Sequence, residues 1–463
     1  MTRVGAARRP SGARVVVVGA GSGGATIAAR LSEHPGVTVE LFEAGPDHRS
    51  ADTPAAIAGS SYAAAVREPG RTWSALEAVR ASGQAARPYL RGRGVGGSSA
   101  INALVALPGR PEDYDEWVHL HGCDGWGWSD IEPWFDRTAL TLRRAPRAEW
   151  GALNRLVGTV WPESARGVPL TRDHAGRRVS VNDAYLEPAR SRPELIVHGD
   201  SLVEQVLFDG RRAVGVLAAG REVPADLVVV SAGTIHSPAL LLRSGVDTPG
   251  LGEGLCDHPS FPVTIVRHEP ADTQSLPIAT VVQLPGAEGP DDLQLLPIDH
   301  VDAQHPEVAV VLAAVMRVHS RGAVRLASSD PRVDPIVEFD MLSDDRDVSA
   351  IELAIDALER IVDDPGLSAI GSALPYDRSE AGIRAAVGDY VHAAGTCAMG
   401  RVVDTAGRVK GYDDLMVCDA SVMPALPRAN THLPTVMLAE RLAAVTLERL
   451  RSLGRLDASA PGG

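Results

Sequence analysis

The sequence predicts an α/β fold with a second domain of α+β type, and three observations support this prediction. First, the chain opens with an apolar strand, a glycine-rich turn, a helix and another strand. Second, a strand-rich patch follows in the middle of the chain. Third, residues 261–340 contain further β-like runs before a helical pattern returns at 346–363. A chain of 463 residues is long enough for more than one domain.

The N-terminal unit reads ARVVVVG, AGSGG, ATIAARLSEH and VTVELFEAG. Its GAGSGG segment fits G-x-G-x-x-G, in which Gly19 permits the tight turn, Gly21 admits a pyrophosphate and Gly24 allows close helix–strand packing. Ser22 lies at the helix N-terminus, whose N–H groups attract anions. Glu43 ends the second strand, where it could accept hydrogen bonds from a ribose diol. The unit predicts a Rossmann-like dinucleotide-binding domain, although the motif alone does not separate FAD from NAD.

The later elements are predicted from alternation and turn residues. Residues 195–233 indicate an antiparallel meander with turns at Asp209-Gly210 and Ala219-Gly220, ending in the buried strand LVVVSAG. The runs FPVTIV, VAVVLAAVM and GAVRLAS suggest the sheet of a second domain. A loop-rich region extends from Pro46 to about Pro88, and residues 111–190 contain short helical pieces. VMLAERLAAVTLERL reads as a long helix, and the final DASAPGG as a frayed end.

The composition is that of an ordinary globular protein, with 44% hydrophobic and 22% charged residues. A formal charge of −14 disfavours nucleic acid as a partner, because phosphate backbones bind clustered Lys and Arg. Four cysteines without a CxxC pair predict reduced thiols. No apolar signal core of ~7–15 residues follows the basic start, and no apolar run approaches the ~18 residues of a membrane span. We therefore expect a soluble, cytoplasmic protein.

A second glycine-rich run, GRGVGGSSAIN, begins at Gly92 and offers amide and hydroxyl donors at Gly97 and Ser98. With its flanks it becomes GRGVGGSSAINALVALPGRPEDYD, which resembles the first signature of the glucose–methanol–choline (GMC) oxidoreductases; GTIHSPALLLRSGV resembles the second. The segments GEGLCDHP, SRGAVRLASSDP, HAAGTCAMG and VCDASVMPALPRANTH follow in that family's usual order. The resemblance covers nearly the whole chain.

The resemblance implies an FAD-binding domain assembled from discontinuous segments and a GMC-type substrate domain built on a mostly antiparallel sheet. It implies oxidation of an alcohol CH–OH group with hydride transfer to flavin N5. We therefore expect five segments along the chain: FAD-binding 13–110, substrate or lid 111–190, FAD-binding 191–260, substrate-binding 261–385, and FAD-binding with the catalytic histidines 386–455.

Two histidines are the expected catalytic residues. A lone His near a helix start usually caps the helix or faces water, and His432 alone would be read so. In the family, however, a His before GTC and a His or Asn before the final helix lie at the flavin, and His392 and His432 are matched to them. His392 is expected to accept the hydroxyl proton, since an imidazole pKa lies near neutrality. His432 is expected to hydrogen-bond the same oxygen.

Further FAD contacts follow from the resemblance and from the final helix. Pro434 suits a first helical turn, and Thr435 follows it. The helix N-terminus would stabilise negative charge near flavin N1 and the C2 carbonyl. Asp419 and Ala420 are expected by the ribityl chain. Asn102 resembles a flavin-contacting position, and Val203 the residue whose backbone touches adenine.

Three features refine this expectation. Ile101 stands where some relatives attach FAD through a His, so non-covalent FAD is expected. The segment after Gly245 and residues 140–180 are short, which suggests a reduced lid and a more open mouth. His392, Cys397, Cys418 and His432 match no usual metal-ligand spacing, so no metal is expected.

The leading functional prediction is an FAD-dependent alcohol dehydrogenase. The compact length and the PRANTH ending also resemble the actinobacterial subgroup associated with mycofactocin, whose reduced form would then be the donor. Its electrons would pass to a separate acceptor such as a quinone, the respiratory chain or a redox cofactor. Two alternatives remain open: an oxidase that uses O₂, and a non-catalytic flavin-binding module, which retention of both histidines disfavours.

Overall fold

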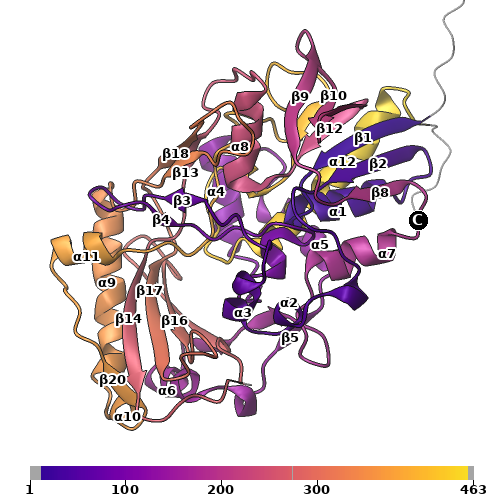
Figure 1. Ribbon diagram of the computed structural model, residues 1–463. Coiled ribbons are helices and arrows are strands. Elements are labelled where there is room, and N and C mark those ends of the chain that lie inside the picture. The colour runs from indigo at the N-terminus through magenta and orange to yellow at the C-terminus, as the bar shows by residue number, and fades with distance from the viewer. Residues whose placement is uncertain (1–11, 274, 457–463) are drawn as a thin grey trace, which may run out of the picture.

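A five-stranded parallel sheet is assembled from four distant parts of the chain, in the order β21-β12-β1-β2-β8 (Figure 1). The computed structural model describes residues 12–273 and 275–456. The valine run of the central strand is buried because paired strands flank it on both sides and helices cover the sheet. The strands are β1 (Ala13–Val18), β2 (Val37–Phe42), β8 (Leu195–His198), β12 (Leu227–Val230) and β21 (Leu415–Val417).

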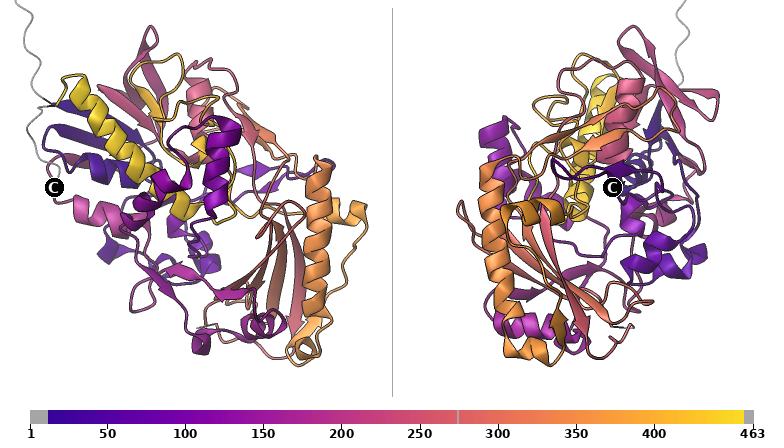
Figure 2. Two further views of the ribbon diagram at one scale, coloured as in Figure 1. Left: turned by 180° about the vertical axis from the view of Figure 1, so that it is seen from behind. Right: turned by 60° about the vertical axis from the view of Figure 1, so that its left-hand side comes forward.

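The first and last helices of the described chain pack against each other beside this sheet (Figures 1 and 2). They are α1 (Ser22–Leu31) and α12 (His432–Ser452). Both start at a polar residue and bury an almost continuous apolar surface. The two helix N-termini therefore lie in one region, although about 400 residues of sequence separate them.

A second, six-stranded sheet forms the other lobe, and every neighbouring pair in it is antiparallel. Helix α9 (Asp345–Val362) lies along it in Figures 1 and 2 and buries Ile351, Ile355, Leu358 and Ile361. The strands, in sheet order, are β20 (Gly371–Ala373), β14 (Ser260–Arg267), β17 (Val308–Val315), β16 (Leu293–Ile298), β15 (Thr280–Leu284) and β6 (Ala165–Gly167).

These features confirm the predicted α/β architecture with a mostly antiparallel second sheet. The predicted meander is formed by β9 (Val203–Asp209), β10 (Arg212–Ala218) and β11 (Arg221–Pro224). Its turn residues Gly210, Ala219 and Gly220 all have positive φ, as tight turns require. The helix predicted at 346–363 is α9.

Three details differ from expectation. GAVRLAS forms β18 (Gly322–Arg325), as predicted, but this strand is not part of the six-stranded sheet. It pairs with β13 (Glu253–Leu255) and β19 (Ile336–Glu338) in a separate sheet. Alternating apolar residues predict that a strand forms, but they do not predict which strand it pairs with. The final helix begins two residues before Pro434, which still lies in its first turn. The expected frayed end DASAPGG lies outside the described residues.

The second glycine run contains a 3₁₀ turn, Gly97–Ala100, and the apolar segment that follows the run is not helical. The Asn102 side chain then accepts a hydrogen bond from the backbone N–H of Leu104, and Leu104 has φ +68°. This local bond competes with helix formation, as Asn side chains commonly do. Over residues 12–273 and 275–456, the helices include none that is both long and apolar enough to cross a bilayer.

Candidate active site

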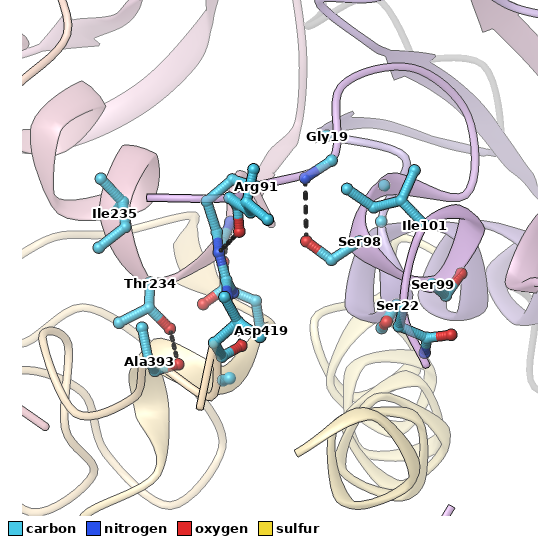
Figure 3. Close-up of a pocket in the computed structure, with 18 of the residues that line it drawn as sticks. Gly19, Ser22, Arg91, Ser98, Ser99, Ile101, Thr234, Ile235, Ala393 and Asp419 are labelled. Atoms are coloured by element: carbon cyan, nitrogen blue, oxygen red, sulfur yellow. Dashed lines mark hydrogen bonds between the residues drawn. The ribbon is translucent and has the colours of Figure 1, made fainter. Parts of the chain in front are cut away.

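A large pocket opens where the two glycine-rich runs meet (Figure 3). A Cβ on Gly97 would lie 2.7 Å from the Cα of Gly21, and Gly97 has φ +50°, so both the approach and the backbone angle require glycine. A Cβ on Gly24 would lie 1.9 Å from the carbonyl oxygen of Gly19. Gly24 therefore allows the close helix–strand packing predicted for it, while Gly21 and Gly97 shape the pocket wall.

Glu43 joins the two runs. Its carboxylate accepts hydrogen bonds from the backbone N–H groups of Ala20 at 2.8 Å, Gly45 at 2.9 Å and Gly94 at 2.9 Å. Three of the roughly four acceptor positions of a carboxylate are thus used within the chain. Glu43 also lines the pocket, so one position remains for a ligand hydroxyl.

The pocket receives two helix N-termini that no side chain caps. Neither α1 nor α12 has a side-chain cap hydrogen bond. The first N–H groups of a helix have no partner within it and carry partial positive charge, so such ends bind anionic groups. Ser22 and His432 begin these helices and hydrogen-bond each other, from the hydroxyl oxygen to Nδ1, at 2.8 Å. Two anion-binding helix ends therefore lie together.

His392 is held from two sides. Its Nδ1 lies 3.0 Å from Nδ1 of His258, and its Nε2 lies 3.2 Å from Nδ2 of Asn430. Its ring also meets that of Tyr390 edge-on, with the centroids 5.0 Å apart. His258 comes from the DHP segment after β13, and Asn430 from the turn before α12. Residues from three parts of the chain thus fix this imidazole at the pocket wall.

His432 does not occupy the position beside His392 that we expected. The described hydrogen-bond partners of the His392 imidazole are His258 and Asn430, whereas the His432 imidazole contacts Ser22. The reason is the start of α12, which directs His432 toward the N-terminus of α1 and leaves Asn430 in the turn before the helix. The Nε2 atom of His432 has no partner among the described residues, and the residue lines the pocket.

Burial keeps the imidazoles of this site neutral. The pKa of His392 is lowered well below its ordinary value by burial, and then by His258 and Arg91. Burial lowers the pKa of His258 to about 3 and, with Arg178, that of His432 to about 4. An imidazole that is neutral at neutral pH has one nitrogen free to accept a proton.

Sequence reasoning found most of the pocket but missed His258 and Asn430. Both stand in segments already singled out, DHP and PRANTH, yet only contacts in space distinguish them. Asp419 accepts hydrogen bonds from Gly233 N–H at 2.9 Å and from the Ser237 hydroxyl. The predicted residues that line the pocket are Gly19, Gly21, Ser22, Glu43, Gly97, Ser98, Asn102, Val203, His392, Asp419, Ala420, His432 and Thr435.

One cluster brings metal-type ligands together. Asp257, His258 and His392 place ligand atoms within 4.8 Å of one another. Most of their polar atoms are already engaged, because Asp257 accepts backbone hydrogen bonds and the two Nδ1 atoms face each other. Nε2 of His258 has no partner among the described residues. Cys397 and Cys418, which we had weighed as ligands with the histidines, lie outside this cluster and are buried free thiols.

Comparison with known proteins decides the family. Two family profiles, both described as GMC oxidoreductase, match the chain. One matches residues 13–156 and 149–260, and the other matches residues 318–439. The chain belongs to the GMC oxidoreductase family. This GMC protein is 31% identical to 5-(hydroxymethyl)furfural oxidase of Methylovorus sp. (strain MP688), over 92% of its own length and 97% of the relative's. It is 30% identical to mitochondrial choline dehydrogenase of Mus musculus, over 92% of this chain and 88% of that protein.

A solved structure supports the same fold. Pyridoxine 4-oxidase from Mesorbium loti superposes with a TM-score of 0.86 at 25% identity, covering 94% of this GMC chain and 99% of the other. The alignment with the furfural oxidase runs over 525 positions, more than the 463 residues of this chain. The relative therefore contains insertions that this chain lacks, in keeping with the short segments noted in the sequence.

Proposed function

We propose that this protein is an FAD-dependent dehydrogenase that oxidises an alcohol CH–OH group. The observation that supports it most is the neutral, buried His392, whose Nε2 lies beside Asn430 at the pocket wall while His258 holds the other side of the ring. Such an imidazole can accept a hydroxyl proton, and an amide N–H beside it can hold the oxygen.

The residues around the pocket fit a dinucleotide. Gly19, Gly21 and Ser22 of the first run, with the uncapped N-terminus of α1, would hold the pyrophosphate, and Glu43 a ribose hydroxyl. Val203 would lie by the adenine, and Asp419 and Ala420 by the ribityl chain. When bound, FAD supplies the hydride acceptor. The side chain at the family's attachment position is Ile101, which cannot form a covalent bond to the flavin.

The proton transfer depends on which nitrogen of His392 is protonated. For Nε2 to accept the substrate proton, the ring hydrogen must be on Nδ1. Nδ1 of His258, 3.0 Å away, can accept that hydrogen, so the pair is consistent with an Nε2 base. The pKa of His392 is not near neutrality, as a free imidazole would have it, because burial lowers it. The ring is therefore unprotonated at neutral pH and is a weaker base than a free imidazole.

Asn430 replaces His432 as our choice for the group that holds the substrate oxygen. Its Nδ2 lies 3.2 Å from Nε2 of His392 and donates to that nitrogen when the ring hydrogen is on Nδ1. A substrate hydroxyl bound between the two would replace this bond, with its oxygen accepting from Asn430 and its proton passing to Nε2. His432 instead has its free Nε2 in the pocket and its Nδ1 on Ser22, an arrangement that suits contact with the cofactor. Thr435, Asn102, Gly97 and Ser98 remain proposed FAD contacts by their place in the pocket wall.

For the electron acceptor we retain a separate molecule such as a quinone, the respiratory chain or a redox cofactor. Reduced mycofactocin remains a proposed donor to the flavin, in the role of the alcohol. The short segments support an open mouth, and four buried free cysteines support a reducing, cytoplasmic setting. O₂ is the second candidate acceptor, because similar proteins include the furfural and pyridoxine oxidases.

The test is anaerobic stopped-flow flavin reduction by a panel of alcohols, with purified protein that contains FAD. Acid precipitation is expected to leave all flavin in the supernatant. Reduction by at least one alcohol, followed by faster reoxidation with a quinone than with O₂, is the expected result. Flavin that no alcohol reduces would refute the alcohol oxidation, and O₂ reoxidation as fast as turnover would favour the oxidase.

A further inference from the structure

We infer that the substrate is a neutral, largely apolar alcohol, a conclusion that rests on the proposed function and names its substrate class. The first observation is the wall beside His392. Tyr390, whose ring contacts His392, belongs to one hydrophobic cluster with side chains from the six-stranded sheet. The pocket-lining members of that cluster from the sheet lobe are Ile278, Leu296, Ile298 and Leu312.

Further apolar residues line the same pocket. Tyr62 and Val66 come from helix α3 (Tyr62–Arg67), and Ile101, Ala103 and Val105 follow the second glycine run. The hydroxyl of Tyr390 accepts a hydrogen bond from Gln294 at 2.8 Å, which partly satisfies the polar end of that ring. An aliphatic or aromatic group bound against these side chains would be removed from water.

The second observation concerns charge. Three carboxylates line the described pocket, and each is already engaged: Glu43 by three backbone amides, Asp389 by Arg80, and Asp419 by Gly233 and Ser237. Glu43 and Asp419 also belong to the dinucleotide side. Among the described lining residues, no uncompensated carboxylate therefore faces the apolar walls. A cationic group bound there would lose its hydration without gaining an ion pair, which is unfavourable.

This predicts discrimination against choline, the substrate in the names of several relatives. The matched comparison is choline against its neutral isostere, in which carbon replaces the quaternary nitrogen. The isostere should reduce the flavin with a second-order rate constant roughly 100-fold higher or more, because only the charge differs. Straight-chain primary alcohols should gain about three- to fourfold for each added methylene until the cavity is filled.

A paired substitution tests the charge argument directly. Leu312→Asp adds a carboxylate to the wall and Leu312→Asn adds a similar polar group without charge. The ratio of choline to isostere rate constants should rise in the Asp variant and not in the Asn variant. Equal or better reaction of the wild type with choline would overturn this inference while leaving alcohol oxidation intact. An FAD-loaded protein that no alcohol reduces would instead overturn the proposed function, and the substrate class with it.

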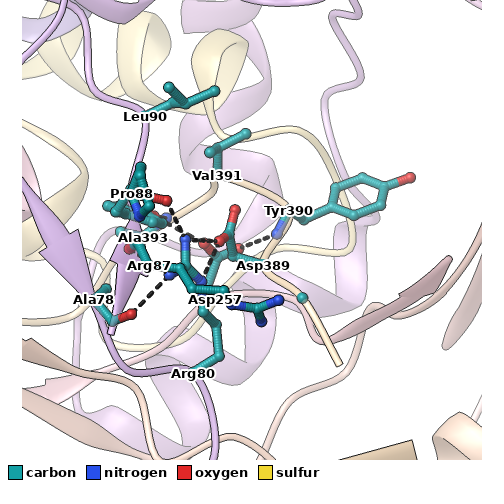
Figure 4. Close-up of polar contacts among 12 residues, drawn as sticks. Ala78, Arg80, Arg87, Pro88, Leu90, Asp257, Asp389, Tyr390, Val391 and Ala393 are labelled. Carbon is teal, nitrogen blue, oxygen red and sulfur yellow. Dashed lines mark hydrogen bonds and ion pairs between the residues drawn. The ribbon is translucent and has the colours of Figure 1, made fainter. Parts of the chain in front are cut away.

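A separate observation concerns the backbone beside His392. Val391 has φ +57°, a left-handed conformation that is strained for a β-branched residue. Asp257 accepts hydrogen bonds from the N–H groups on both sides of Val391, those of Tyr390 at 3.3 Å and His392 at 3.0 Å. Figure 4 shows Asp257, Tyr390 and Val391. Arg91 donates to the Val391 carbonyl. The strained turn is therefore held at several points.

Asp257 also fixes its surroundings. It accepts a hydrogen bond from the backbone N–H of His258 at 2.8 Å, and from the Tyr89 hydroxyl at 2.8 Å. Arg80 and Asp389 form an ion pair at the start of the same turn, as Figure 4 shows. We propose that Asp257 is a positioning residue that holds Val391 in its left-handed conformation and so orients the His392 imidazole.

The test is a double-mutant cycle on flavin reduction. Asp257→Asn should slow reduction by about 10- to 100-fold with FAD content kept. A neutral amide oxygen accepts the three backbone hydrogen bonds more weakly than a carboxylate, and the amide NH₂ replaces the oxygen that accepts from Tyr89. In a Val391→Gly background the same substitution should cost clearly less, since glycine adopts positive φ without strain. Equal losses in both backgrounds, or unchanged reduction in Asp257→Asn, would contradict the proposal. Loss of FAD from both Asp257 variants would assign the residue a structural role instead.

Discussion

The two ends of the pocket are built in different ways. The dinucleotide end consists of backbone: glycines that touch at Gly21 and Gly97, uncapped helix N-termini, and amides gathered by Glu43. The end proposed to be catalytic consists of side chains, with His258, His392 and Asn430 brought together from three loops. The first end depends on local conformation, which sequence motifs encode. The second depends on tertiary contacts between residues far apart in the chain.

The comparison has a practical consequence. At the dinucleotide end, an added Cβ on a glycine should lower FAD affinity, and so should loss of the side chains that act there, Glu43 and His432. At the catalytic end, removing a side chain should leave FAD bound and slow the chemistry. Variants that separate FAD content from the rate of flavin reduction therefore test whether the two ends are independent.

The largest effect is expected for His392→Ala. Loss of a general base typically lowers the rate by about 10²–10⁴, which is roughly 3–5 kcal/mol of barrier. FAD content should stay normal, because His392 contacts His258 and Asn430 and not the glycine runs. Anaerobic flavin reduction measures the change. His305→Ala is the matched control, since that side chain is 64% exposed. A wild-type rate in His392→Ala would show that another group takes the proton.

At the dinucleotide end, Gly21→Ala should reduce FAD affinity by about 10- to 100-fold without unfolding the chain. Gly21 has φ −81°, which alanine adopts readily, and its added Cβ would meet only Gly97 Cα, at 3.9 Å. The methyl group would, however, occupy the space expected for the pyrophosphate. Titration of apoprotein with FAD measures the change, with Gly59→Ala as a control outside the pocket. Unchanged FAD affinity would show that the pyrophosphate does not bind at this loop.

Smaller effects on rate and on FAD affinity should distinguish the role of Asn430 from that of His432. Asn430→Ala should slow flavin reduction by about 10-fold, because one hydrogen bond to the substrate oxygen is lost while the base remains. His432→Ala should lower FAD affinity more than it lowers the rate, since His432 is bonded to Ser22. The double variant His392→Ala/Asn430→Ala should lose less than the product of the single losses if both residues act on one oxygen. A larger rate loss in His432→Ala would restore our original choice of His432.

The difference between the two ends explains how much of the fold and of the site could be predicted from the sequence. The parallel sheet, the meander and the pocket contacts of Gly19, Gly21 and Glu43 follow from periodicity and local motifs. The exchange of Asn430 for His432 could not be predicted, because it depends on where α12 begins, and helix starts are uncertain by a residue or two. The contact of His258 with His392 could not be predicted either, because the two residues are 134 positions apart and such a contact produces no local sequence pattern.

The smallest expected effect is a pH dependence of stability from His432, whose pKa burial lowers to about 4. In the unfolded chain a histidine has a pKa of about 6.5. Below that value the unfolded state binds more protons than the folded state, so the free energy of unfolding falls as pH falls, and it is unaffected well above that value. Between pH 7.5 and 5.5 this one group should remove about 1 kcal/mol. Buried carboxylates such as Asp257, whose pKa burial raises to about 7, act in the opposite direction. The measurement is therefore the difference between wild type and His432→Gln in urea unfolding at the two pH values, which cancels the shared groups. The wild type should lose about 1 kcal/mol more than the variant. Parallel losses in the two proteins would mean that His432 becomes protonated in the folded state and is not held neutral at the helix end.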